Sequence, residues 1–157
     1  MAEREHHYQV SLEWTGNTGS GTSGYGAYER AHLISATGKA PIEASSDPHF
    51  RGDGGRWNPE ELLLASLSSC HQLWYLHLCA VNKVVVVAYR DRPDGVMAEH
   101  ADGSGEFTRV VLRPEVIIAE GSDPDTARRL HHEAGRMCFV ARSMNFPVEH
   151  EPTVRVA

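Results

Sequence analysis

The chain has 157 residues, a hydrophobic fraction of 41%, a charged fraction of 23% and a formal net charge of −6 at pH 7. This length suffices for a buried core, and we expect a single domain over residues 1–157. The absence of a dense Lys and Arg cluster argues against nucleic acid as a partner. The sequence shows no signal peptide and no run of about 18 uncharged apolar residues, so we expect a cytoplasmic protein with no membrane partner.

The N-terminal part of the chain predicts three strands joined by loops. Residues 8–14 alternate between apolar and polar side chains, as a strand with one buried face does. Further strands are predicted over residues 28–35 and 41–44. The loop after the first strand contains G-x-G-x-x-G at residues 19–24, formally a phosphate-binding pattern. A dinucleotide fold needs a helix directly after this pattern, and a strand follows instead, so we interpret the loop as a long hairpin connection.

The longest predicted element is a helix over residues 58–80. Asn58 is a favoured N-cap residue, and Pro59 suits the first helical position. Glu60 and Glu61 follow, where acidic side chains face the positive end of the helix dipole. The helix is apolar almost all round, which predicts burial on most sides. Because a domain this small cannot easily surround a helix about 35 Å long, the pattern favours a partner subunit.

The remainder of the chain predicts more strands and one further helix, giving an α+β fold. The second helix is expected over residues 123–139, with Ser122 as its N-cap and Cys138 in its last turn. Pro114 is expected at a bulge or sheet edge within a long strand. The predicted strands of this part are 83–90, 96–100, 106–119 and 153–156, and the predicted turns are 92–95 and 102–103.

Three cysteines are the candidate reactive groups. In a cytosolic chain they argue against a structural disulfide framework and for reactive or merely buried thiols. Cys70 lies in a polar notch, SSCH, in the middle of the apolar helix. Cys79 is nine residues further on, about 900° around the same helix, so the two point to opposite faces. Cys138 lies on a different helix; the fold could bring it to Cys70, or the two could be unrelated buried thiols.

A metal site is disfavoured although the chain has ten histidines. His77 lies seven residues from Cys70 and His131 seven residues from Cys138, about 10 Å along each helix, too far to share a tetrahedral ion. His71 points about 100° away from Cys70 and cannot activate that thiol by adjacency alone. We therefore expect no metal and no cofactor, and a cysteine protease or acyltransferase is a weak alternative.

The sequence is similar to a known family in three segments: NPEELL at 58–63, ASLSSCH at 65–71 and CFVA at 138–141, with Ser143. These resemble the OsmC / organic hydroperoxide resistance family, and the resemblance runs from about residue 14 to the C-terminus. It implies an OsmC-like fold of antiparallel strands with a long buried central helix, a second late helix and an intertwined homodimer. The chain departs from the family at Phe139, where many members have Pro.

The resemblance also implies a function. Cys70 would be the peroxidatic cysteine and Cys138 the resolving cysteine of a peroxidase that reduces hydroperoxides, organic ones in particular, in oxidative-stress defence. An external dithiol would reduce the resulting disulfide. Aromatic and thioether side chains are candidates for an apolar substrate pocket, although each is more often plain core: Trp74, Phe107, Met137, Phe139 and Phe146. The alternative is a non-enzymatic OsmC-like stress or binding protein with inert cysteines.

The family also uses an Arg–Glu pair at the reactive thiol. Glu60 matches the carboxylate by position, and Arg30 is favoured over Arg51 and Arg56 as the cation. Physically, a thiol in mid-helix gains little from the helix dipole and needs an outside positive charge. Ten residues of helix span about 15 Å, so Glu60 cannot reach Cys70 along its own helix. We therefore expect the pair to come from the other subunit.

Overall fold

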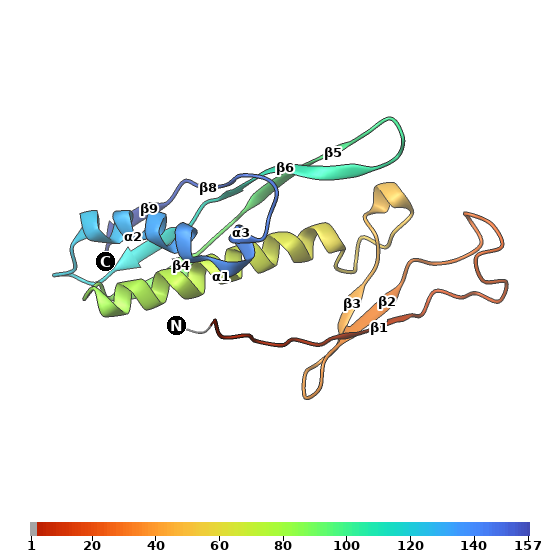
Figure 1. The fold of residues 1–157 in the computed structure, drawn as a ribbon, viewed down its shortest axis with the longest axis horizontal. Helices are drawn as coiled ribbons and strands as arrows, with labels where there is room; N and C mark the ends of the chain where they lie inside the picture. The colour runs from red at the N-terminus through yellow and green to blue at the C-terminus, as the bar shows by residue number, and fades with distance from the viewer. Residues whose placement is uncertain (1–2) are drawn as a thin grey trace. The chain divides into compact units, whose positions relative to one another are not determined.

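A computed structural model of the protein describes residues 3–157. The chain divides into two compact units, Met1–Leu62 and Leu63–Ala157, both drawn in Figure 1. The long helix α1 (Pro59–Val81) begins in the first unit and continues into the second. The expectation of a single domain stays a prediction.

The first unit contains a three-stranded antiparallel sheet in the order β1-β2-β3. All three predicted strands are present, although each starts later than predicted, and the structure adds a short 3-10 helix before α1. In the glycine-rich loop, the side chain of Asn17 accepts hydrogen bonds from the backbone N–H groups of Gly19 and Gly21, each 3.0 Å long. The elements are β1 (Ser11–Trp14), β2 (His32–Ser35), β3 (Ile42–Ala44) and η1 (Pro48–Phe50).

Helix α1 begins as the sequence predicts. The backbone N–H of Glu61 donates to the Asn58 side-chain oxygen over 2.8 Å, and the Asn58 N–H donates back to the Glu61 carboxylate over 3.3 Å. This reciprocal pair is a capping box, which satisfies two N–H groups that a helix start otherwise leaves unpaired.

The second unit contains two three-stranded sheets, β4-β7-β9 and β5-β6-β8. In each, an antiparallel pair is extended by a C-terminal strand that runs parallel to its neighbour. The sheets are therefore mixed, and the α+β class is confirmed. Strand β9 falls where the sequence predicts it, whereas β8 was not predicted. The strands are β4 (Val86–Arg90), β5 (Asp94–Glu99), β6 (Gly105–Leu112), β7 (Glu115–Ile118), β8 (Val148–His150) and β9 (Thr153–Val156).

The prediction of one long strand over residues 106–119 is wrong, because the chain breaks at Arg113 and Pro114 into β6 and β7, which lie in different sheets. Pro114 has no N–H for a sheet ladder. The N–H of Arg113 donates instead to the Asp91 side chain over 2.7 Å. The predicted turn over residues 92–95 is also wrong at its end, since Asp94 and Gly95 already belong to β5.

The second long helix, α2 (Pro124–Met137), is capped one residue later than predicted. Asp123, not Ser122, accepts the backbone hydrogen bond of Thr126, over 3.1 Å. The Ser122 hydroxyl accepts from the N–H of Val85 instead. Cys138 is the C-cap of α2 rather than part of its last turn, and a short helix, α3 (Phe139–Arg142), follows directly.

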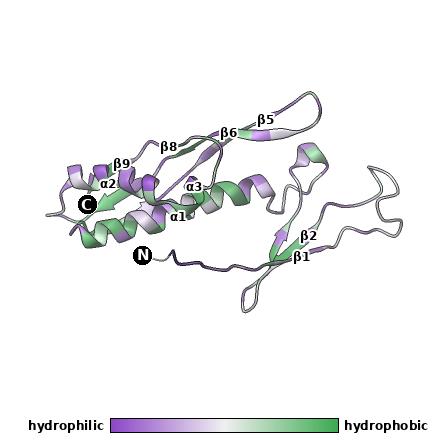
Figure 2. Ribbon diagram, in the orientation of Figure 1, coloured by the Kyte–Doolittle hydropathy of each residue, from purple (hydrophilic) through white to green (hydrophobic). Residues whose placement is uncertain are grey.

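The core of the second unit lies in two clusters along α1. One joins α1 to α2 and to the β4-β7-β9 sheet. The other joins α1 to β6 and the segment after Cys138. Figure 2 shows the apolar character of α1 beside the more polar α2. The fully buried residues of α1 recur at every fourth position: Leu67, His71, Tyr75 and Cys79.

The capping box makes a direct prediction for stability. Asn58→Ala should lower the free energy of unfolding by about 1 kcal/mol, because the Glu61 N–H loses its partner. Chemical denaturation measures this loss. Asn58→Asp keeps the acceptor and is the matched control; equal losses in the two variants would contradict the role assigned to the side chain.

Candidate active site

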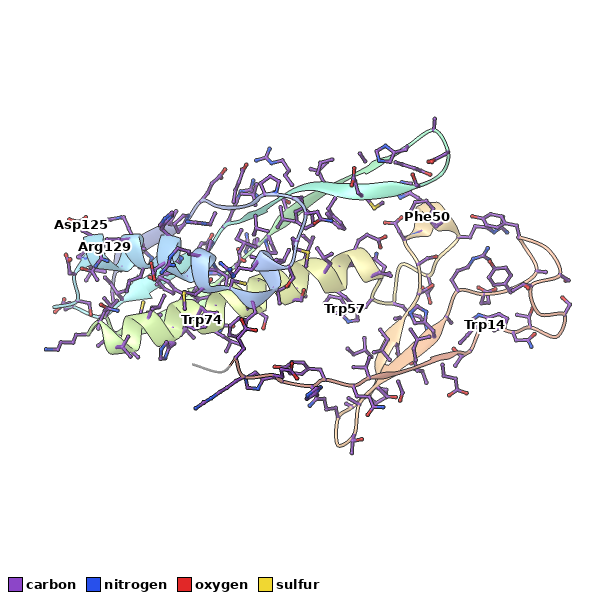
Figure 3. The ribbon with its side chains drawn as sticks, in the orientation of Figure 1. Trp14, Phe50, Trp57, Trp74, Asp125 and Arg129 are labelled. Carbon is purple, nitrogen blue, oxygen red and sulfur yellow. The ribbon has the colours of Figure 1, made fainter. Side chains whose placement is uncertain are left out.

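Cys70 lies half-buried on α1 and lines a pocket of about 320 Å³ within the second unit. Two aromatic side chains form part of its wall. Trp74 comes from the next turn of α1 (Figure 3), and Phe139 comes from α3; their rings meet edge to face with centroids 5.4 Å apart. The pocket is otherwise lined by Ser66, Ser69, Leu73 and Val140.

Cys138 lies buried beside Cys70. Its backbone N–H donates to the carbonyl of Ala134 over 2.9 Å, and its sulfur accepts from the N–H of Ala141 over 3.5 Å, so the end of α2 and the start of α3 both fix its position. Burial, followed by a side-chain hydrogen bond between the two thiols, raises the pKa of Cys138 to about 11. Cys138 is thus a neutral thiol at physiological pH, next to the thiol that lines the pocket.

Cys79 has different surroundings. It is buried in the core between α1, α2 and the β4-β7-β9 sheet, and burial raises the pKa of its thiol. It does not line the Cys70 pocket. These properties fit a small buried apolar side chain.

Of the five side chains predicted as pocket candidates, Trp74 and Phe139 line the Cys70 pocket. Phe107 and Phe146 pack against each other in the second core cluster, with ring centroids 5.6 Å apart. Met137 is half-buried at the end of α2 and outside the pocket wall.

In the first unit, Arg30 is held by tyrosines. Its guanidinium donates to the backbone carbonyls of Tyr28 and Tyr25 over 2.6 and 2.7 Å. It also lies over both rings, 3.9 Å from the Tyr28 centroid and 4.8 Å from that of Tyr25. Arg51 lies over the Tyr25 ring at 5.4 Å. Two of the three candidate arginines therefore share one aromatic support.

Glu60 has a buried carboxylate oxygen, Oε2, with no hydrogen-bond partner among residues 3–157. Within residues 3–62, none of Arg30, Arg51 and Arg56 forms an ion pair with it. Arg56 instead approaches the carboxylates of Asp53 and Glu43, at 3.8 and 4.0 Å. Burying a carboxylate oxygen without a partner destabilises the protein, so a hydrogen-bond donor to Glu60 would be favourable.

Sequence reasoning missed a buried histidine pair behind Cys70. Nε2 of His71 on α1 and Nδ1 of His131 on α2 are 3.1 Å apart. Both residues are buried, with 1% of His71 and 0% of His131 exposed. Burial, with the nearby His150, lowers the pKa of His71 to about 4. Burial, with His71 and His150, lowers that of His131 to about 3. The available signal was that both histidines fall on the buried faces of their helices.

Among residues 3–157, no group of three or more His, Cys, Asp and Glu side chains is arranged to hold a metal ion. None of the helices in this described range is long and apolar enough to cross a membrane.

Comparison with known proteins identifies the family to which this fold belongs. Residues 52–153 match the family described as OsmC-like protein, and the chain belongs to this family. An OsmC-like protein of unknown function from Vibrio cholerae is 30% identical, with a TM-score of 0.86 over 95% of this chain and 100% of that one. No curated protein is significantly similar to this sequence.

More distant structures share the fold. An organic hydroperoxide resistance protein from Legionella pneumophila is 18% identical, with a TM-score of 0.68 over 97% of this chain and 100% of that one. Another from Elizabethkingia anophelis, with thiocyanate bound, is 17% identical, with a TM-score of 0.68 over 98% of this chain and 100% of that one.

The histidine pair predicts how stability depends on pH. Both pKa values lie below the 6.5 of an ordinary histidine, so the unfolded chain binds more protons than the folded one in mild acid. The free energy of unfolding is therefore highest above about pH 6.5, where both rings are neutral in the folded and the unfolded chain. It falls as the pH drops toward 4, because the unfolded chain then takes up protons that the folded one does not. Each histidine should add up to about 1.4 kcal/mol per pH unit to the slope of the free energy of unfolding against pH.

Urea denaturation between pH 5 and 8 measures this slope. The double variant His71→Gln/His131→Asn, which has no ionisable ring at either position, should give a shallower slope. His77→Gln, which changes an exposed histidine on the same helix, should leave the slope as in the wild type. An unchanged slope in the double variant would show that the pair does not carry the pH dependence.

Proposed function

We propose that this protein is a thiol-dependent peroxidase that reduces organic hydroperoxides through a disulfide cycle of Cys70 and Cys138. The observation that carries the proposal is the asymmetry of the two thiols: Cys70 lines a pocket, and Cys138 lies buried behind it as a neutral thiol. Family membership and the structural likeness to organic hydroperoxide resistance proteins support the same chemistry.

The proposed cycle has three steps. The Cys70 thiolate attacks the outer oxygen of the hydroperoxide, and the O–O bond breaks. The alkoxide leaves and takes up a proton to become an alcohol. Cys70 is thereby oxidised to a sulfenic acid. The Cys138 sulfur then attacks the Cys70 sulfur, and the hydroxyl group leaves as water as the disulfide forms. An external dithiol reduces this disulfide by thiol exchange and is itself oxidised.

The pocket favours an organic substrate over hydrogen peroxide. Leu73, Trp74, Phe139 and Val140 offer apolar contact to the carbon part of a hydroperoxide, whereas hydrogen peroxide has none to bury. Each buried CH₂ group adds about 0.8 kcal/mol of binding.

Arg30 is proposed as the cation that holds the Cys70 thiolate, and Glu60 as the carboxylate that orients this arginine. An arginine stays protonated at all relevant pH values, and a carboxylate orients its planar guanidinium by paired hydrogen bonds. Oε2 of Glu60 has no partner among residues 3–157 and so has a free lone pair for such a guanidinium in the assembled dimer. Exposed apolar side chains on α1 and α3, Leu73 at 63% and Phe139 at 69%, support burial in a homodimer.

The cysteine roles predict three different outcomes in an assay of cumene hydroperoxide consumption with dithiothreitol. Cys70→Ser should lower the rate by at least about 100-fold, because the attacking sulfur is lost. In Cys138→Ser, the sulfenic acid formed on Cys70 has no resolving thiol, so a dimedone probe should trap it. Cys79→Ser is the matched control and should retain activity. A fully active Cys70→Ser variant would exclude the proposal in favour of an OsmC-like protein with inert cysteines.

Sharing of the site between subunits predicts complementation. Cys70→Ser and Glu60→Ala homodimers should each be inactive. After unfolding and refolding an equal mixture, about a quarter of the sites should regain activity, since half of the dimers are mixed and each has one intact site. Glu60→Ala/Cys70→Ser protomers mixed with either single variant should regain none beyond their own background. A mixture as inactive as its parents would show that Glu60 does not act in trans.

A further inference from the structure

We propose that the hydrogen-bonded pair of His71 and His131 positions Cys138 against Cys70 and so sets the rate at which the disulfide between them closes. The inference rests on the proposed function, because it concerns the second step of that cycle. Neither histidine lines the Cys70 pocket, so both are positioning residues.

On α1, the pair begins one residue after the reactive cysteine. Neighbouring residues of a helix differ by about 100°, so Cys70 lines the pocket while His71 points into the core. Nε2 of His71 meets Nδ1 of His131 at 3.1 Å, and the planes of the two rings differ by only 2°. The hydrogen bond to Nδ1 of His131 on α2 thus fixes the orientation of the α1 face next to Cys70.

On α2, the contact is reinforced by a tyrosine one turn along α1. The His131 ring stacks on Tyr75 with centroids 3.8 Å apart, and the Tyr75 hydroxyl donates to the carbonyl of Ala127 over 2.9 Å. From His131 the helix runs about two turns to its C-cap, Cys138. Any shift of α2 against α1 therefore moves the backbone of Cys138 relative to Cys70.

A hydrogen bond suits this task better than an apolar contact. Apolar packing is non-directional, whereas a hydrogen bond weakens steeply when its angle or length changes. A disulfide forms only within a narrow range of Cβ separation and dihedral angle, so a small sliding of α2 slows closure. The polar pair is costly to bury: with either tautomer, Nε2 of His131 has no partner among residues 3–157. The chain keeps it where an apolar pair would be cheaper.

The charge state of the pair depends on its neighbours from each packed element. His150 on β8 approaches both rings, with centroids 5.6 Å from His71 and 6.5 Å from His131. His132 on α2 lies 6.4 Å from His150, and Tyr75 on α1 covers His131. Burial and these histidines favour the neutral rings, in which one N–H and one lone pair meet. The hydrogen bond is therefore intact at physiological pH.

The closure step can be measured without any peroxide. Ellman's reagent reacts with Cys70 to give a mixed disulfide and one thionitrobenzoate. Cys138 then attacks the Cys70 sulfur, forms the Cys70–Cys138 disulfide and expels a second thionitrobenzoate. The two releases are separated by stopped-flow absorbance, and Cys138→Ser should show only the first. The third cysteine, Cys79, is buried and outside the pocket, so it should not react with Ellman's reagent in the folded protein.

His71→Leu replaces the ring with an apolar side chain of similar size and so removes the hydrogen bond. The first release should stay within about twofold of the wild type, and the second should slow by about tenfold, equivalent to about 1.4 kcal/mol. His71→Gln, whose amide nitrogen takes the place of Nε2, should restore closure to within about threefold. If the leucine variant does not fold, His71→Asn serves the same purpose, because its shorter side chain does not reach His131.

Ile118→Val is the matched control, since it weakens the same core from strand β7 without touching the pair. The proposal is overturned if both releases slow together, if His71→Gln is as slow as His71→Leu, or if Ile118→Val slows closure as much. Failure of the wild type to consume hydroperoxides overturns the peroxidase proposal alone, because the Ellman's measurement does not depend on it.

Discussion

The structure of the second unit depends on one periodic constraint: every fourth residue of α1, from Leu67 through His71 and Tyr75 to Cys79, is buried. An α-helix has 3.6 residues per turn, so such a series follows one face of the helix with a slow drift. Both core clusters form along this face. Cys70 precedes one member of the series, about 100° away, and is therefore held rigidly while it stays half-buried. A reactive group needs this combination of fixed position and access.

The two thiols near this face have opposite environments. Cys70 has a pocket in front of it, whereas Cys138 has α2 on one side and α3 on the other. Desolvation makes the Cys138 thiolate costly, so this thiol stays protonated at physiological pH. In the proposed cycle, this difference in burial favours reaction of Cys70 before Cys138.

The sequence predicts local features well and long-range ones poorly. The start of α1 is confirmed because its cap involves only Asn58 and Glu61, three residues apart. The cap of α2 was misplaced by one residue, because Ser122 and Asp123 are both good N-caps and Ser122 is engaged by Val85, distant in the chain. The break at Pro114 also depends on a distant partner, Asp91. Local patterns contain no information about such contacts.

The candidate site follows the same division. The sequence places Cys70 and Cys138 on separate helices but cannot decide whether they meet, since that depends on how α1 and α2 pack. For the same reason the contact between the two histidines could not be predicted, because His71 and His131 are 60 residues apart. Of the predicted pocket side chains, Trp74 lies one turn from Cys70 and Phe139 directly follows Cys138, whereas Phe107 and Phe146 pack in the core.

Strands β8 and β9 have a consequence for how the protein is made. Each adds in parallel to one of the two sheets, and both follow all their partners in the chain. During synthesis on the ribosome, neither sheet can be completed until the segment after α3 has emerged. Parallel pairings of this kind require long loops to close first, which makes them slow. Until then, the helices that carry the two cysteines have an incomplete core behind them, and a nascent chain is most exposed to premature oxidation in this interval.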